Sequence, residues 1–219
     1  MSGQSPLSSG GDRLKVFLDG LPVEMQWLAG HHIVWQTGQQ NGPDDVGPDS
    51  HTHCSALVAA IALDLDVYIL RPPNHSQQLL SNAQMDWLAE ARTFPGPTAE
   101  AAGWRELGSS GDDGVLENAV AAANAGKLVV AGYRQPPASD SPTGATHQKP
   151  GHVVIVRPQE GPISASDGPR VVMAGNRNWR SIHMKNAFKS HPTAWPDNIR
   201  LYVHDTDLEL DVPAMAGVG

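Results

Sequence analysis

The sequence has one cysteine, few aromatic residues, no long apolar run and no basic run. Cys54 is the only cysteine among 219 residues, so no internal disulfide can form and the fold does not depend on an oxidising compartment. The longest apolar run, around residues 54–63, is too short to span a bilayer. Lys and Arg total 15 against 23 Asp and Glu, which gives a net charge of −8, and aromatics make up 5%. We therefore expect neither a nucleic acid nor a membrane as a partner.

The length and the 40% hydrophobic content predict one domain with one full core. We expect this domain to span residues 12–211, with Asp12 capping its first helix. Residues 1–11 are rich in Ser and Gly and are predicted to be disordered, and residues 212–219 are predicted to be a flexible tail. The first residues have neither the basic start nor the apolar centre of a secretion signal. We expect synthesis in the cytoplasm and, for any action on the cell wall, export by a signal-independent route.

Helix patterns crowd the first half of the chain and strand patterns the second. The predicted helices cover 54–65, 76–92, 115–126 and 183–191, the strands cover 127–133, 152–158, 169–175 and 199–204, and loops cover 38–50 and most of 93–114. No regular alternation of strand and helix is present. The pattern therefore predicts an α+β fold with an antiparallel sheet.

Cys54 lies where a polar stretch turns into an apolar helix, in HTHCSALVAAIALDL. Unpaired N–H groups and the helix dipole favour a thiolate at such a position, so we expect a lowered thiol pKa. The backbone N–H of Cys54 is expected to help stabilise an oxyanion. His152 follows a Pro-Gly turn in KPGHVVIVRP, at the start of a predicted strand. A cysteine at a helix start with a histidine at a strand start is the arrangement that a cysteine hydrolase needs.

The strings CSALV and GHVVIV resemble the two catalytic motifs of the NlpC/P60-like cysteine peptidases, a papain-like group. The resemblance implies that Cys54 is the nucleophile, that His152 is the base, and that the nucleophile helix packs on an antiparallel sheet. His53 stands where the family usually has Asp or Asn. Many members cut amide bonds in peptidoglycan stem peptides, several are amidase effectors exported between bacteria, and others in the wider fold transfer acyl groups. An exported effector would imply an immunity protein as a partner.

The family also has a third polar residue, on the strand after the histidine, that orients the imidazole. A hairpin centred near Ser164 would place Asn176 opposite His152, and a neutral amide oxygen can accept the ring N–H. Asn178 would face the same side two residues on and stays an alternative.

The segment 134–150 is long for a plain connection and leads directly into His152. Loops of this length are usually functional. We therefore expect it to contact the substrate, through Thr146, His147 and Gln148.

Together these features predict a cysteine amidase or peptidase that uses no cofactor and no metal, with a peptidoglycan peptide as the substrate that the resemblance implies. Three alternatives stay open. The same pair could serve a cytoplasmic deamidase or acyltransferase. His51, His53 and Cys54, with His147 or His152, could form a zinc site. The chain could also be a non-catalytic binding module.

Overall fold

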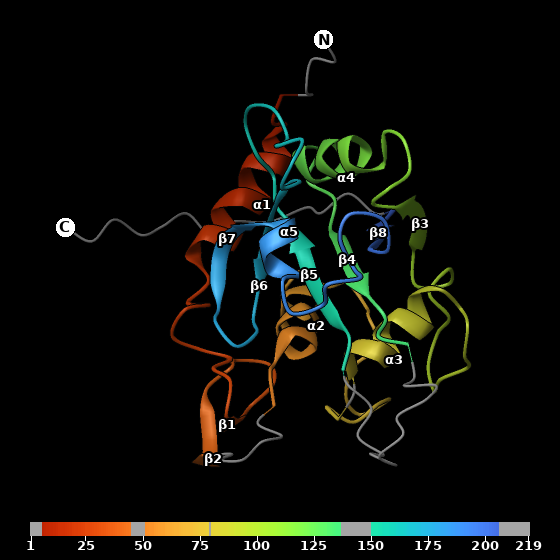
Figure 1. Ribbon diagram of the computed structural model, residues 1–219. Helices are drawn as coiled ribbons and strands as arrows, with labels where there is room; N and C mark the ends of the chain where they lie inside the picture. The colour runs from red at the N-terminus through yellow and green to blue at the C-terminus, as the bar shows by residue number, and fades with distance from the viewer. Residues whose placement is uncertain (1–5, 45–50, 79, 137–149, 206–219) are drawn as a thin grey trace, which may run out of the picture.

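The structure is a computed structural model that describes residues 6–44, 51–78, 80–136 and 150–205. These residues form an α+β fold, as predicted, with five helices packed on a six-stranded antiparallel sheet and a separate two-stranded hairpin (Figure 1). The helices are α1 (Ser9–Gly20), α2 (Cys54–Asp64), α3 (Leu80–Leu88), α4 (Val115–Asn124) and α5 (Met184–Ala187). The sheet contains β3 (Trp104–Ser109), β4 (Val129–Tyr133), β5 (His152–Val156), β6 (Arg170–Met173), β7 (Trp179–His183) and β8 (Arg200–His204), and the hairpin contains β1 (His31–Ile33) and β2 (Gln40–Asp44).

The strand order in the sheet is β3-β8-β4-β5-β6-β7, so β5 is an inner strand between β4 and β6. Every residue of β4 and β5 is buried. The continuous apolar runs VVAGY and HVVIV are typical of strands that are covered on both faces. His152, the first residue of β5, therefore lies on an inner strand and is buried.

Helices cover both faces of this sheet (Figure 1). One core cluster contains the apolar residues of α2 and α3, and the other contains those of α4 and α5. Side chains alternate along a strand: in β5, Val153 and Ile155 belong to the α2 cluster, whereas Val154 and Val156 belong to the other. The two faces of β5 therefore meet different helices.

Helix α2 matches its prediction closely. It begins at Cys54, and all its residues as far as Ala62 are buried. A helix that is apolar all round is expected in the interior of a protein, and α2 packs on β5. None of the helices in the described part of the chain is long and apolar enough to cross a membrane.

The start of α1 differs from the prediction. Ser8 is the N-cap, and its Oγ accepts a hydrogen bond of 3.1 Å from the Gly11 N–H. Residues 9–11 are therefore helical and not disordered, and Asp12 lies in the first turn instead of capping it. Ser8 Oγ also donates to the carbonyl of Asn124, at the end of α4. This contact is made across the fold and has no signature near Ser8 in the sequence.

Strands β3 and β7 were not predicted, and neither was the pairing of β1 with β2. Strand β3 lies in the segment predicted as mostly loop and pairs with β8, which follows it far along the chain. The indole N–H of Trp104 donates to the carbonyl of Tyr68 at 2.7 Å. Strand β2 contains Gly42 and Pro43, which are typical of turns. The partner of β3 is distant in sequence, whereas β1–β2 and β6–β7 are local hairpins. In each case strand pairing outweighs a weak local pattern.

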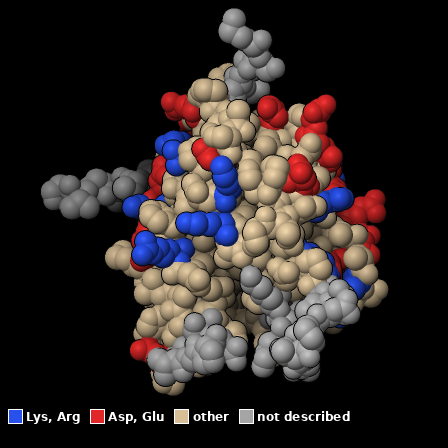
Figure 2. Space-filling model, in the orientation of Figure 1, with Lys and Arg blue, Asp and Glu red and all other residues tan. Residues whose placement is uncertain are grey.

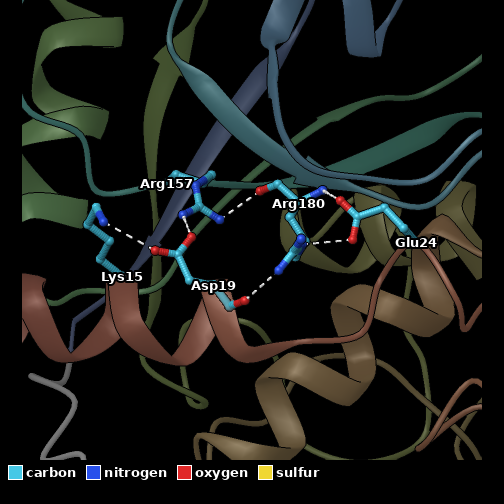
Figure 3. Close-up of polar contacts among 5 residues, drawn as sticks. All are labelled: Lys15, Asp19, Glu24, Arg157 and Arg180. Carbon is cyan, nitrogen blue, oxygen red and sulfur yellow. Dashed lines mark hydrogen bonds and ion pairs between the residues drawn. The ribbon is translucent and has the colours of Figure 1, made fainter.

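A polar network fastens α1 to the ends of the sheet strands (Figure 3). The guanidinium of Arg157 is only 5% exposed and pairs with Asp19 of α1. It also donates to the carbonyl of Arg180 at 2.6 Å. Arg180 in turn pairs with Glu24 and donates to the carbonyl of Asp19. The network fixes α1 and residue 24 against β7.

Charges are divided over the surface. Figure 2 shows Lys and Arg gathered over α5 and β7 on one side of this face, with Asp and Glu along its upper and opposite margins.

Candidate active site

Cys54 is the first residue of α2 and is 3% exposed. Burial raises the pKa of its thiol, although the backbone of Val153, Ser55 and Cys54 and the hydroxyl of Ser81 hydrogen-bond the sulfur and act in the opposite direction. The predicted lowering of this pKa is therefore wrong. Desolvation disfavours the charged thiolate more than the helix start favours it.

His152 begins β5 and is 5% exposed. Its ring meets Phe188 edge-on, with centroids 5.1 Å apart, and stacks on His191 at 5.8 Å. Burial, and then the neighbouring His191, lower the pKa of His152 to about 3. The ring is therefore neutral near pH 7. Its Nε2 is buried and has no hydrogen-bond partner among the described residues.

The positions of the thiol and the ring follow from the strand pairing. The Arg157 N–H donates to the Arg170 carbonyl. Since hydrogen-bonding positions recur every second residue in an antiparallel ladder, the N–H of Val153 points to the same side, toward β6. Strand β6 ends at Met173, and the Val153 N–H hydrogen-bonds the sulfur of Cys54. The thiol therefore lies at the β6 side of β5, where β6 has ended.

The ring of His152 approaches this place from the other face of the sheet. Phe188, which it contacts, belongs to the cluster of α4 and α5, whereas Cys54 belongs to the cluster of α2 and α3. A Cβ at Gly175 would lie 3.8 Å from the Cε1 of His152, so the ring borders the end of β6. The structure brings the two predicted elements together, and the two side chains border the same strand end from opposite faces.

The expected register of β5 and β6 is off by one residue. Ile155 pairs with Val172 and Val156 with Val171, which places Gly175 opposite His152 in place of Asn176. Asn176 lies in an exposed bend. A shift of one residue moves a side chain to the opposite face of the sheet. The observed register therefore does not place Asn176 against the ring of His152.

Asn178 fastens the turn that follows β6. Its Oδ1 accepts from the Gly175 N–H at 3.0 Å. Its Nδ2 donates to the carbonyls of Val23, Gln26 and Trp27 at 3.0, 2.7 and 3.1 Å. These bonds use the amide to hold backbone, so Asn178 is a structural residue in this arrangement.

Helix α3 supplies polar neighbours that the sequence analysis missed. Its polar residues Ser81, Asn82, Gln84 and Asp86 are buried. Ser81 bonds both the Cys54 sulfur and the carbonyl of Gly151. Gln84 donates to the carbonyl of Ser55 at 3.2 Å. The helix predicted over 76–92 has an amphipathic pattern, which places its polar residues toward solvent. The structure buries these four in α3, and buried polar side chains need hydrogen-bond partners.

The remaining predicted site residues are His53, the zinc-site candidates and the three residues of the 134–150 segment. The Nε2 of His53 hydrogen-bonds the carbonyl of His31 at 2.9 Å, so His53 ties the start of α2 to the hairpin. Across the described ranges, no three His, Cys, Asp or Glu side chains form a group able to hold a metal. Thr146, His147 and Gln148 lie outside the described residues.

A scan against protein-family models gave no match for this chain, and no curated protein matches it either.

Proposed function

We propose that this protein is a cysteine amidase of the papain-like NlpC/P60 type, with Cys54 as nucleophile and His152 as general base and then general acid. The observation that carries the proposal is the position of the Cys54 sulfur. It accepts a hydrogen bond from the backbone N–H of Val153, the residue that follows His152 in the chain. The cysteine at a helix start and the histidine at the start of the adjoining strand are the elements this chemistry requires.

The charge states favour a neutral pair over a preformed thiolate–imidazolium pair. The raised pKa of Cys54 keeps the thiol protonated, and the lowered pKa of His152 keeps the imidazole neutral. Because both shifts oppose proton transfer between the two groups in the free protein, the transfer must accompany the attack on the substrate. The thiol proton would pass to the ring as the sulfur attacks the amide carbonyl. The ring must come within hydrogen-bond distance of the sulfur when substrate is bound, because catalytic hydrogen bonds often tighten only in the complex.

The remaining steps balance without a cofactor. The backbone N–H groups of Cys54 and Ser55, which lie at the start of α2 and help to stabilise a thiolate there, would donate to the tetrahedral oxyanion. The imidazolium returns its proton to the leaving amine as the C–N bond breaks. Water then attacks the thioester, the ring takes the proton from that water, and Cys54 is released as the thiol.

The proposed substrate is an amide bond in a peptidoglycan stem peptide, which rests on the resemblance of CSALV and GHVVIV to the family motifs. The protein would then be a bacterial effector that acts on the cell wall after signal-independent export, with an immunity protein as a partner in the producing cell. Asn176 would contribute to orienting the ring only if the turn after β6 rearranged, since it is exposed here.

The test is incubation of the full chain with purified sacculi, followed by mass spectrometry of the soluble products. The wild type should cleave one defined stem-peptide bond, leaving a new amine and a new carboxylate. Cys54→Ala should abolish release, and His152→Gln should lower kcat by at least about a hundredfold. His32→Gln changes an exposed histidine and is the matched control that should retain activity.

The compartment of toxicity distinguishes this proposal from a cytoplasmic deamidase or acyltransferase. Expression directed to the periplasm should lyse cells, while cytoplasmic expression should be tolerated. Toxicity confined to the cytoplasm, with intact sacculi, would overturn the peptidoglycan substrate and favour the alternative.

A further inference from the structure

A small hollow of about 260 Å³ lies beside the candidate site. Its polar lining includes Asn82 and Asp86 from α3, Arg92 and Arg134. Asn82 directly follows Ser81, which bonds the Cys54 sulfur. The Oδ1 of Asn82 accepts the N–H of Gly151 at 3.0 Å, directly before His152. The hollow is therefore joined to both halves of the candidate site through α3.

The charges in this lining leave one cation in excess. Asp86, whose side chain is 4% exposed, forms a two-point ion pair with Arg134 through the Nε and Nη2 of that arginine. Arg92 approaches the same carboxylate with one nitrogen, at 3.6 Å, and its side chain is 64% exposed. Two guanidinium groups thus share one carboxylate. Arg92 retains donors that are open to a ligand.

Asn82 adds a donor whose direction is fixed by its partners. Its Oδ1 accepts two backbone N–H groups, from Gln135 at 3.2 Å and from Gly151 at 3.0 Å. The oxygen must occupy that side of the amide, so the NH2 group occupies the other. Asn82 is 5% exposed, and its buried Nδ2 has no hydrogen-bond partner among the described residues. A buried donor left unpaired is costly, which favours an acceptor supplied by a ligand.

We propose that this hollow binds a carboxylate of the substrate, held by the guanidinium of Arg92 and the amide NH2 of Asn82. That the ligand is the acidic part of the amide substrate rests on the proposed function; the carboxylate site itself does not. A planar carboxylate suits the donor fork of an arginine. The volume of about 260 Å³ is below that of a complete small-molecule pocket and fits one part of a larger ligand.

The test measures binding without catalysis, by calorimetry of the full-length Cys54→Ala protein. The probes are the dipeptide alanylglutamate and its neutral isostere alanylglutamine. Alanylglutamate should bind at least about tenfold more tightly, since a charge-assisted hydrogen bond distinguishes the two. Equal affinity for the two dipeptides, or no binding of either, would overturn the site. Inorganic phosphate that binds as tightly as alanylglutamate would overturn its selectivity for carboxylate.

Two substitutions locate the site. Arg92→Gln should weaken alanylglutamate binding at least about tenfold. Asn82→Asp keeps an acceptor for the Gly151 and Gln135 N–H groups, removes the NH2 donor and adds a repelling charge, so it should weaken binding further. Arg105→Gln is the matched control, because Arg105 is an exposed arginine of β3 that pairs with Asp205 and does not line the hollow. Unchanged affinity in Arg92→Gln would overturn the site.

The outcomes also separate this inference from the proposed function. Binding with the stated preference but no hydrolysis of sacculi by the wild type keeps the carboxylate site and overturns the amidase. Hydrolysis without any preference for alanylglutamate keeps the amidase and overturns the site.

Discussion

The backbone N–H of Val153 hydrogen-bonds the sulfur of Cys54. This single contact joins the start of α2 to the start of β5, and it places the thiol beside the strand that carries His152. It also lies in a fully buried environment, where both ionisable groups are held in their neutral forms.

The raised pKa of Cys54 predicts slow alkylation in the native state. At about pH 8, iodoacetamide should modify the native protein at least about tenfold more slowly than the protein in concentrated urea, because both the thiolate fraction and the access are reduced. Mass spectrometry of timed samples measures both rates. A faster reaction in the native protein would show that the thiol is exposed and ionised.

The lowered pKa of His152 predicts a loss of stability in acid. The ordinary histidine pKa of 6.5 applies to the unfolded chain, whereas the native ring takes up a proton only near a pKa of about 3. The unfolded state therefore binds more protons between these values. The free energy of unfolding should be fully retained above about pH 6.5 and should fall below it by up to about 1.4 kcal/mol per pH unit.

Urea unfolding of the wild type and of His152→Gln at several values between pH 4 and pH 8 isolates this contribution from that of the carboxyl groups. The variant should lose the part of the slope that His152 causes, whatever its absolute stability. His32→Gln, at an exposed position, is the matched control. The same slope in His152→Gln would contradict the burial of a neutral ring.

The two asparagines after β6 should differ sharply. Asn178→Ala removes three hydrogen bonds to the backbone of residues 23–27 and one within the turn, so we expect a loss of about 2–3 kcal/mol in the free energy of unfolding. Asn176→Ala, in the exposed bend, should stay within about 0.5 kcal/mol of the wild type. Urea unfolding measures both variants. If Asn176→Ala instead abolishes hydrolysis while leaving stability unchanged, Asn176 orients the base in the complex.

The network in Figure 3 should depend mainly on Arg157. Arg157→Met leaves the carbonyl of Arg180 and the carboxylate of Asp19 without this donor, which should lower the free energy of unfolding by about 2–3 kcal/mol. Lys15→Met removes an exposed ion pair with the same Asp19 and should cost less than about 0.5 kcal/mol. Equal effects of the two substitutions would show that burial of the guanidinium is unimportant.

Local sequence was sufficient for α2, α4 and the inner strands β4, β5, β6 and β8. These elements have continuous or periodic apolar patterns whose lengths and flanking turn residues distinguish helix from strand, and the α+β class follows from their order. The positions of Cys54 at a helix start and His152 at a strand start were predictable for the same reason, because each follows a clear change in pattern.

Tertiary structure decided the register, the edge strands and the chemistry of the site. The pairing of β5 with β6 differs by one residue from the expected hairpin centred near Ser164, and this shift places Gly175 instead of Asn176 opposite His152. Strand β3 exists because β8 pairs with it, and Ser81 reaches Cys54 because α3 folds back beside α2. The pKa of Cys54 is raised because desolvation depends on every atom packed around the sulfur, whereas the helix start that a sequence reveals is only one local contribution.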